Sequence, residues 1–154
     1  MFSFSLRRSL ALVLCFSIMA AASVVLAQEQ QAEWMEIVRA AEQLAQQQQP
    51  EQALAELQKV FSQTDEFAPA YFVAGMVYAS TGDMAKAYEN MVQATVHDPS
   101  MGMAHRMASQ GAGAMGNFDA SWDHAIKAHQ AGTDMADAFE ACLLYTSPSP
   151  RDGL

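Results

Sequence analysis

Methionine and histidine alternate in one short stretch of the chain, just after residue 100. The segment MGMAHRM carries Met101, Met103, His105 and Met107 at every second position. Thioether and imidazole groups together suit Cu(I), and alternate positions share one side of an extended or flexible segment. On a helix they do not share a side, and Met also fills irregular gaps in helical cores. A copper-binding carrier is therefore one hypothesis for this stretch, and simple packing is the other.

The other residues that could do chemistry form no recognisable site. His124 and His129 are five positions apart, which places them poorly for joint metal binding on one helix. The chain has no G-x-S-x-G nucleophile motif, no H-E-x-x-H zinc motif and no Gly-rich phosphate loop opening a helix. We therefore expect no catalytic residues, no metal ligands and no cofactor, and a protein that is not an enzyme.

Start and stop signals divide the central part of the chain into six predicted helices. Pro50 suits a first helical turn, and Gly82-Asp83 suits a helix end followed by an N-cap. Asp98-Pro99 stops the helix that precedes it, because Pro cannot continue a helix. Together with the 34-residue repeat described next, these signals predict an all-α protein with helices at 30–47, 50–63, 70–81, 84–97, 103–115 and 118–131.

Several residues recur at a fixed spacing of 34 positions. Such a period indicates a repeat architecture, in which each unit covers the apolar face of its neighbour. The recurring residues are Gly82-Asp83 and Gly116-Asn117, Ala94 and Ala128, and Ala53, Ala87 and Ser121.

The segment APAYFVAGMVYASTGDMAKAYENMVQATVHDPS resembles the tetratricopeptide repeat family, whose unit carries W-x2-L-G-x2-Y, then A-x3-F, then P. Its small residues Gly75 and Ala87 would let two antiparallel helices approach closely. The resemblance implies a solenoid of about three antiparallel helix pairs, with units at about 34–67, 68–101 and 102–135 and a further helix starting at 135–141. The matching residues are Tyr71, Ala74, Gly75, Tyr78, Ala87, Met91 and Pro99.

In this family the first helices of successive units line a concave groove that binds a partner's extended peptide or helix. The resemblance therefore implies a protein-protein interaction scaffold or adaptor for a protein or peptide partner. Phe72 and Met76 have a second interpretation, in which they only pack against the neighbouring unit. Matched position by position, the groove would be lined by Val38, Glu42, Phe72, Met76, Ser80, Met103, Arg106 and Gln110, with Ala45, Gln46, Ala79 and Ala114 beside them.

Residues 1–27 have the anatomy of a secretory signal peptide. Arg7 and Arg8 come first, an apolar run follows as far as Leu26, and small or short residues precede Gln28. We expect cleavage after Ala27 and export of residues 28–141, with the periplasm as the expected compartment. If it were not cleaved, the apolar run of about 17 residues would be at the lower limit of a membrane anchor.

The predicted exported domain is acidic. Residues 28–141 hold 16 acidic and five basic side chains, a net charge of −11 with neutral His. Such a surface repels phosphate backbones, so we expect no nucleic-acid partner, and no membrane contact beyond the signal peptide. Neither Cys lies in this segment, so packing alone must stabilise it, without disulfides.

The run CLLYTSPSPRDGL, residues 142–154, does not continue the helical pattern. Its part CLLYTSPSPRD resembles the translation of a transposase adapter used in preparing sequencing libraries. A genuine tail rich in Ser-Pro is the alternative. Because the run interrupts a helix predicted to begin near Met135, we expect residues 142–154 to contribute to neither the fold nor the site.

Overall fold

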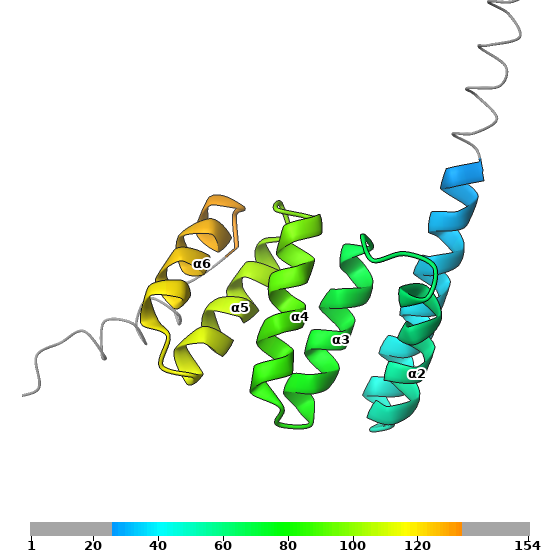
Figure 1. The fold of residues 1–154 in the computed structure, drawn as a ribbon, viewed down its shortest axis with the longest axis horizontal. Coiled ribbons are helices and arrows are strands. Elements are labelled where there is room, and N and C mark those ends of the chain that lie inside the picture. The colour runs from blue at the N-terminus through cyan, green and yellow to red at the C-terminus, as the bar shows by residue number, and fades with distance from the viewer. Residues whose placement is uncertain (1–25, 134–154) are drawn as a thin grey trace, which may run out of the picture. The chain divides into compact units, whose positions relative to one another are not determined.

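The computed structural model describes residues 26–133, and every regular element within that range is an α-helix. Two compact units divide the chain between Glu36 and Ile37, and the helices labelled in Figure 1 belong to the second. Three sequence predictions lie outside the described residues: the signal peptide as far as residue 25, the helix from Met135, and the tail of residues 142–154.

Six helices are present in this part of the chain, as the sequence predicts. The largest difference is at the first helix, which is predicted to start at residue 30 but already includes residue 26, the first residue that the structure describes. No helix among residues 26–133 is long and apolar enough to cross a membrane. The helices are residues 26–46, α2 (Pro50–Phe61), α3 (Ala68–Ser80), α4 (Met84–His97), α5 (Gly102–Ala114) and α6 (Phe118–Gln130).

Three local signals position the helix ends where the sequence predicts them. Pro50 is the first residue of α2. The Asp83 carboxylate caps α4 by accepting a hydrogen bond from the Lys86 backbone N–H at 3.1 Å. At its other end α4 stops at His97, and Asp98 is extended, as expected for a residue before Pro.

The turns before α4 and α6 share one left-handed geometry. Gly82 has φ +84° and Gly116 has φ +77°, a conformation that costs other residues energy. In each turn the next N–H bonds a carbonyl five residues back: Asp83 N–H to Tyr78 O at 3.0 Å, and Asn117 N–H to Ala112 O at 2.9 Å. The 34-residue period of the sequence is therefore also a period of the backbone.

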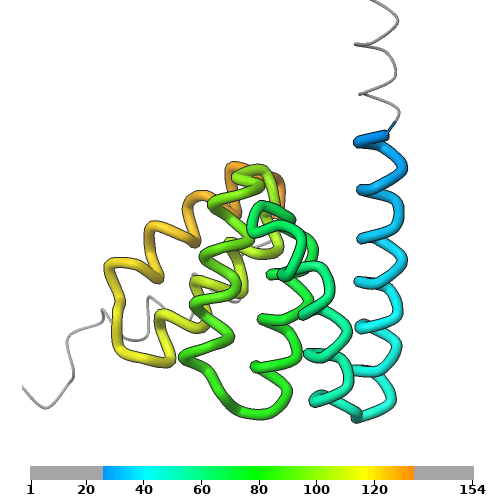
Figure 2. Tube along the Cα trace, turned by 45° about the vertical axis from the view of Figure 1, so that its right-hand side comes forward, coloured from blue at the N-terminus to red at the C-terminus, as the bar shows by residue number. Residues whose placement is uncertain are grey.

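The helices of the second unit contact one another in chain order. α3 has its most extensive contacts with α4, and α5 with α6, while α4 also packs on α5 and α2 on α3. Figures 1 and 2 show α3 to α6 side by side in this order. Within each of the two main pairs the connecting turn is three residues long, so the paired helices run in opposite directions.

Small side chains allow α3 and α4 to approach closely. A Cβ atom on Gly75 would lie 3.2 Å from the Ala87 carbonyl oxygen and 2.7 Å from Met91 Cε. Met91 is almost completely buried, and burying a side chain of this size contributes about 1.5–3 kcal/mol. The close approach predicted from Gly75 and Ala87 is confirmed.

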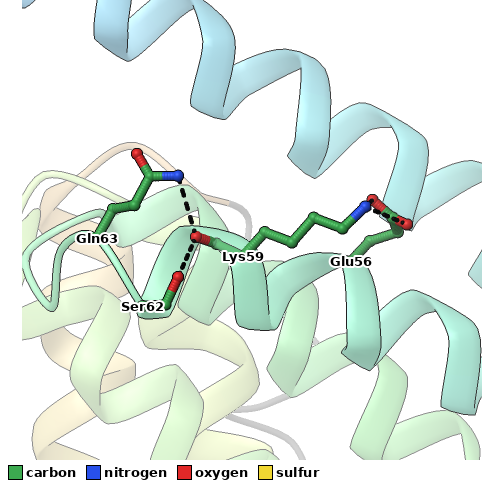
Figure 3. A network of polar contacts seen from close by, with 4 residues as sticks. All are labelled: Glu56, Lys59, Ser62 and Gln63. Carbon is green, nitrogen blue, oxygen red and sulfur yellow. Dashed lines mark hydrogen bonds and ion pairs between the residues drawn. The ribbon is translucent and has the colours of Figure 1, made fainter.

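Side chains on the surface of α2 complete its C-terminal turn (Figure 3). The Lys59 ammonium pairs with the Glu56 carboxylate at 2.6 Å. The Lys59 carbonyl accepts hydrogen bonds from Ser62 Oγ at 2.8 Å and from Gln63 Nε2 at 3.3 Å. An exposed ion pair of this spacing contributes only about 0.2–0.5 kcal/mol. The network therefore supplies hydrogen-bond donors to a carbonyl near the C-terminus of α2 and adds little to the stability of the protein.

Candidate functional site

α3 is apolar on nearly every side. Val73 and Val77 are buried, whereas Phe72 and Met76 on the same helix are half-buried. The only exposed residue of α3 is Ser80, whose hydroxyl donates to the Val77 carbonyl at 2.7 Å. A helix that is apolar all round leaves apolar surface exposed wherever its neighbours do not cover it. α3 therefore presents an incompletely covered face.

Phe72 and Met76 each have a structural role in addition to their exposed part. Both side chains pack against a buried cluster supplied by α4 and α5. The second interpretation of these residues is that they only pack against the next pair of helices. Part of that packing is present, because the cluster includes residues of α5. The rest of each side chain is accessible to solvent. The cluster consists of Met91, Ala94, Ala104 and Ala108.

The predicted groove residues of α5 are more exposed than those of α3. Met103 is 46% exposed, Gln110 is exposed, and Arg106 is half-buried. Arg106 and Gln110 lie 34 positions after Phe72 and Met76, and none of these four side chains is fully buried. Equivalent positions of α3 and α5 are thus accessible in both helices.

The predicted groove residues before α2 differ among themselves. Val38 is only 2% exposed, so its side chain presents almost no surface to a partner. Glu42 and Ala45 are half-buried, and Gln46 is exposed. In this helix the accessible part of the predicted set is therefore mainly polar.

A cavity of about 300 Å³ lies between α3, α4 and α5, and we call it the α3–α5 cavity. Tyr88 and Met91 of α4 contribute to its wall. Ala79 of α3 and Gln110 and Ala114 of α5, all predicted to lie in or beside the groove, line the same cavity. The structure therefore brings the α3 and α5 parts of the predicted groove together at one hollow.

The lysines of the described chain are each paired with an acidic residue close by in the sequence. Each of the three pairs with an acidic residue three or four positions earlier, at 2.6–3.1 Å. These exposed pairs contribute about 0–1 kcal/mol each. Because acidic residues outnumber basic ones in the sequence, 17 to 8, many carboxylates have no lysine to pair with. The pairs are Lys59–Glu56, Lys86–Asp83 and Lys127–Asp123.

A larger cavity, of about 790 Å³, was not predicted from the sequence. We call it the histidine cavity. Val92 and Val96 of α4 form part of its wall, and His105 of α5 and His124 of α6 also line it. The two rings are 4% and 9% exposed, and their Nδ1 atoms are 3.0 Å apart. Two buried imidazoles from different helices therefore meet at this cavity.

The hydrogen bonds of His105 determine which nitrogens carry protons when both rings are neutral. His105 Nε2 lies 3.2 Å from the Pro99 carbonyl oxygen, which can only accept, so Nε2 is the donor. His105 Nδ1 is then an acceptor, and the His124 Nδ1–H must donate to it. The lone pair of His124 therefore resides on Nε2.

Burial keeps both rings in the neutral form. Desolvation lowers the pKa of His105 below its usual value, and the hydrogen bond to Pro99 only partly opposes this. Desolvation also lowers the pKa of His124, and the charge that His105 would carry lowers it further. Both imidazoles are therefore uncharged near pH 7, the form that binds metal ions.

The sequence spacing compares His124 with His129, but the structure pairs it with a different histidine. His129 is exposed, whereas His124 is buried against His105, 19 positions earlier. A signal for this existed in the repeat register, because His105 stands 34 positions after Tyr71, one of the residues that match the repeat pattern. His124 also follows Ser121 by one helical turn on the same buried face.

The alternating methionines of MGMAHRM are not gathered on one side. Met101 and Met107 are half-buried against the cluster around Met91, and Met103 is exposed. Among residues 26–133 no three His, Cys, Asp or Glu side chains are grouped closely enough to hold a metal ion. The structure therefore gives no specific support to a thioether copper site.

No protein-family model matches the chain, and no curated protein matches it.

Proposed function

We propose that this chain is an exported protein of the tetratricopeptide repeat type that acts as a scaffold or adaptor, without catalysis of its own. It binds a partner's peptide or helix along the surface formed by α3 and α5. The recurrence of one glycine turn at Gly82 and Gly116, each between two antiparallel helices, supports the repeat interpretation.

One observation supports this choice of binding surface more than any other. Ala79 of α3 and Gln110 and Ala114 of α5 line the α3–α5 cavity together. Small side chains leave room there for an anchoring group of the partner. Met103, which is exposed on α5, and the accessible part of Met76 on α3 add flexible apolar contact area. Met-rich surfaces of this kind adapt to differently shaped apolar side chains.

The charge of the chain suggests the chemistry of the partner. The whole sequence has a formal net charge of −9, and the described lysines are paired with acidic residues. A segment with an apolar side chain to anchor it and a few basic residues would therefore be attracted and then held. Electrostatic attraction of this kind raises the association rate and weakens with added salt.

A peptide-display selection tests this binding surface. Random peptides displayed on phage would be selected on the purified chain and then measured individually against variants. Met103→Glu and Gln110→Glu should each weaken binding of the selected peptides at least tenfold, because a carboxylate placed against an apolar anchor must lose its hydration, and this cost outweighs the added attraction for basic residues. Val96→Glu is the matched control, since Val96 is 62% exposed on α4 and lies outside the α3–α5 surface.

The variants at Met103 and Gln110 change accessible side chains, so their folding can be checked by circular dichroism and should be unchanged. Phe72 and Met76 are not suitable for this purpose, because both also pack against the buried cluster. Selected peptides that bind Met103→Glu and Gln110→Glu as tightly as the unchanged chain, or that lose binding only with Val96→Glu, would contradict the assignment.

Export has its own test. The full sequence would be expressed in a Gram-negative bacterium, and the mature N-terminus would be determined from the periplasmic fraction by mass spectrometry. A chain beginning at Gln28 supports cleavage after Ala27. A chain that keeps residues 1–27 and is recovered with membranes supports the anchored alternative, and one that stays in the cytoplasm contradicts export.

A further inference from the structure

α6 is held in place by small side chains and one histidine. Besides His124 it buries a serine and two alanines, whereas its larger apolar side chains are exposed. Serine and alanine remove little apolar area from water, so the attachment of α6 depends strongly on the surroundings of His124. Among the described helices, α6 packs mainly on α5. The buried residues of α6 are Ser121, His124, Ala125 and Ala128, and its exposed apolar residues are Phe118, Trp122 and Ile126.

The pair of imidazoles between α5 and α6 can accept one extra proton without losing a hydrogen bond. The His124 Nδ1–H donates to His105 Nδ1 at 3.0 Å, and the His105 Nε2–H donates to the Pro99 carbonyl oxygen at 3.2 Å. Among residues 26–133 no buried side-chain nitrogen or oxygen lacks a hydrogen-bond partner, so His124 Nε2, which has none, is reached by solvent. A first proton can therefore bind at His124 Nε2, on the side of the histidine cavity.

A second proton has no such place. It would have to bind His105 Nδ1, because the other nitrogen of that ring already donates to Pro99. Two Nδ1–H groups would then point at each other across 3.0 Å, and the hydrogen bond between the rings would be lost. Two positive rings would also face each other away from bulk water, where like charges repel strongly. His105 and His124 therefore cannot both be charged while α5 and α6 stay in contact.

The other polar groups around the rings do not remove this repulsion. On α6, Lys127 disfavours a charged ring and Asp123 favours one, and these two side chains pair with each other at 2.6 Å. On α4, Tyr88 meets one of the rings edge-on, with ring centroids 6.2 Å apart, and a phenol is uncharged in acid. In the turn before α5, the Asp98 carboxylate accepts a hydrogen bond from Ser100 Oγ at 2.6 Å.

We propose that the contact between His105 and His124 is an acid-sensitive switch, in which protonation of both rings releases α6 from α5 while α3 and α4 stay folded. This inference does not depend on the proposed binding surface. It assigns a role to His105, the histidine of the MGMAHRM segment, through its contact with another helix.

The direction of the pH dependence follows from the burial of the rings. Desolvation lowers the pKa of both folded imidazoles below their usual value of 6.5. As the pH falls, the rings of a released α6 and α5 therefore take up protons before the folded pair does. The stabilisation is fully present above pH 6.5 and is lost as the pH falls through the lower pKa values of the folded rings.

Hydrogen exchange tests this switch. Exchange of backbone amides in the full chain would be measured by NMR at about pH 7.5 and about pH 5, on either side of the usual histidine pKa. After correction for the intrinsic effect of pH, the amides of α6 should lose at least about tenfold more protection in acid than those of α3 and α4. An equal loss in all three helices would overturn the proposal, because it would indicate general destabilisation by acid.

His105→Gln is the variant that isolates the second proton. Glutamine can accept a hydrogen bond from His124 Nδ1–H and donate one to the Pro99 carbonyl oxygen, but it cannot become charged. This variant should therefore lose most of the acid effect on α6. His129→Gln is the matched control, because His129 is exposed on α6 and its replacement should leave the acid effect unchanged. An acid effect that survives His105→Gln, or that disappears with His129→Gln, would contradict the switch.

The unchanged chain provides a second measurement if His105→Gln does not fold. The ¹⁵N shifts of its imidazoles should show protons on His105 Nε2 and His124 Nδ1 near neutral pH, and in acid His124 Nε2 should gain a proton before His105 Nδ1 does. Two charged rings in a chain whose α6 amides remain protected would overturn the proposal.

Discussion

Gly75 of α3 lies so close to Ala87 of α4 that any side chain there would be crowded, since a Cβ atom on Gly75 would be 3.2 Å from the Ala87 carbonyl oxygen. The Met91 side chain could rotate away from such an atom, but the backbone carbonyl could not. This contact lies within one of the two most extensive helix pairs of the second unit.

Gly75→Val should therefore lower the free energy of unfolding by about 1–3 kcal/mol, because it forces α3 and α4 apart. Ala85→Val on the exposed side of α4 is the control and should change it by about 0.5 kcal/mol or less. Urea denaturation followed by circular dichroism measures both. Equal losses for the two variants would show that the helices can separate at Gly75 without cost.

The turn at Gly116 offers a test of backbone conformation alone. Gly116 has φ +77°, and nothing lies within 4 Å of a Cβ atom placed there. Gly116→Ala should lower the free energy of unfolding by about 1–2 kcal/mol, because a left-handed conformation is unfavourable for Ala. Asn tolerates it better, so Gly116→Asn should cost measurably less in the same denaturation experiment. Identical effects of Ala and Asn would point to another cause.

The cap of α4 should make stability depend on acid pH. The Lys86 backbone N–H lowers the pKa of the Asp83 carboxyl below its usual value of 3.8, and the Lys86 ammonium lowers it further. Because the folded pKa is below the unfolded one, the stabilisation is fully present above pH 3.8 and is lost as the pH falls through the folded pKa.

Asp83→Asn keeps an oxygen at the cap but cannot titrate. It should be less stable than the unchanged chain at neutral pH, and the difference should disappear at pH values well below 3.8. Lys86→Gln should retain most of this pH dependence, because the backbone N–H remains. Denaturation at a series of pH values measures both, and a difference between Asp83→Asn and the unchanged chain that persists in acid would contradict this account.

Replacing a half-buried residue of the proposed binding surface should lower the free energy of unfolding more than replacing an exposed one. Phe72→Ala removes a ring that packs against the Met91 cluster and should cost about 1–2 kcal/mol. Met103→Ala removes an exposed side chain and should change the free energy of unfolding by about 0.5 kcal/mol or less. Thermal or urea denaturation distinguishes them, and an equal cost would mean that Met103 also belongs to the core.

The helix ends could be predicted from the sequence because their causes are local. Pro50 opens α2, the Gly82 turn separates α3 from α4, and Asp98-Pro99 follows the end of α4. Each signal acts through the backbone of its own few residues. The close approach at Gly75 could also be predicted, because neither Gly75 nor Ala87 has the side-chain bulk that would hold two antiparallel helices apart.

The histidine cavity could not be predicted in the same way. The contact between His105 and His124 depends on how α5 and α6 are rotated toward each other, which spacing within either helix does not determine. Val38 also differs from its predicted role, because the repeat register assigns it to a groove position while its side chain is only 2% exposed. Contacts across helices thus limited the prediction of the site more than that of the fold.

Because the turns at Gly82 and Gly116 match, the gene segment between them could be duplicated without disturbing either turn. A tandem duplication of the codons for residues 83–116 would join Gly116 to a second copy of Asp83, a glycine followed by a capping residue, as at both existing turns. Such an insertion lengthens the protein by one helix pair without requiring a new kind of junction. Growth by a whole helix pair is therefore a short evolutionary step, whereas loss of a few residues inside one helix would misalign its contacts with the helices before and after it.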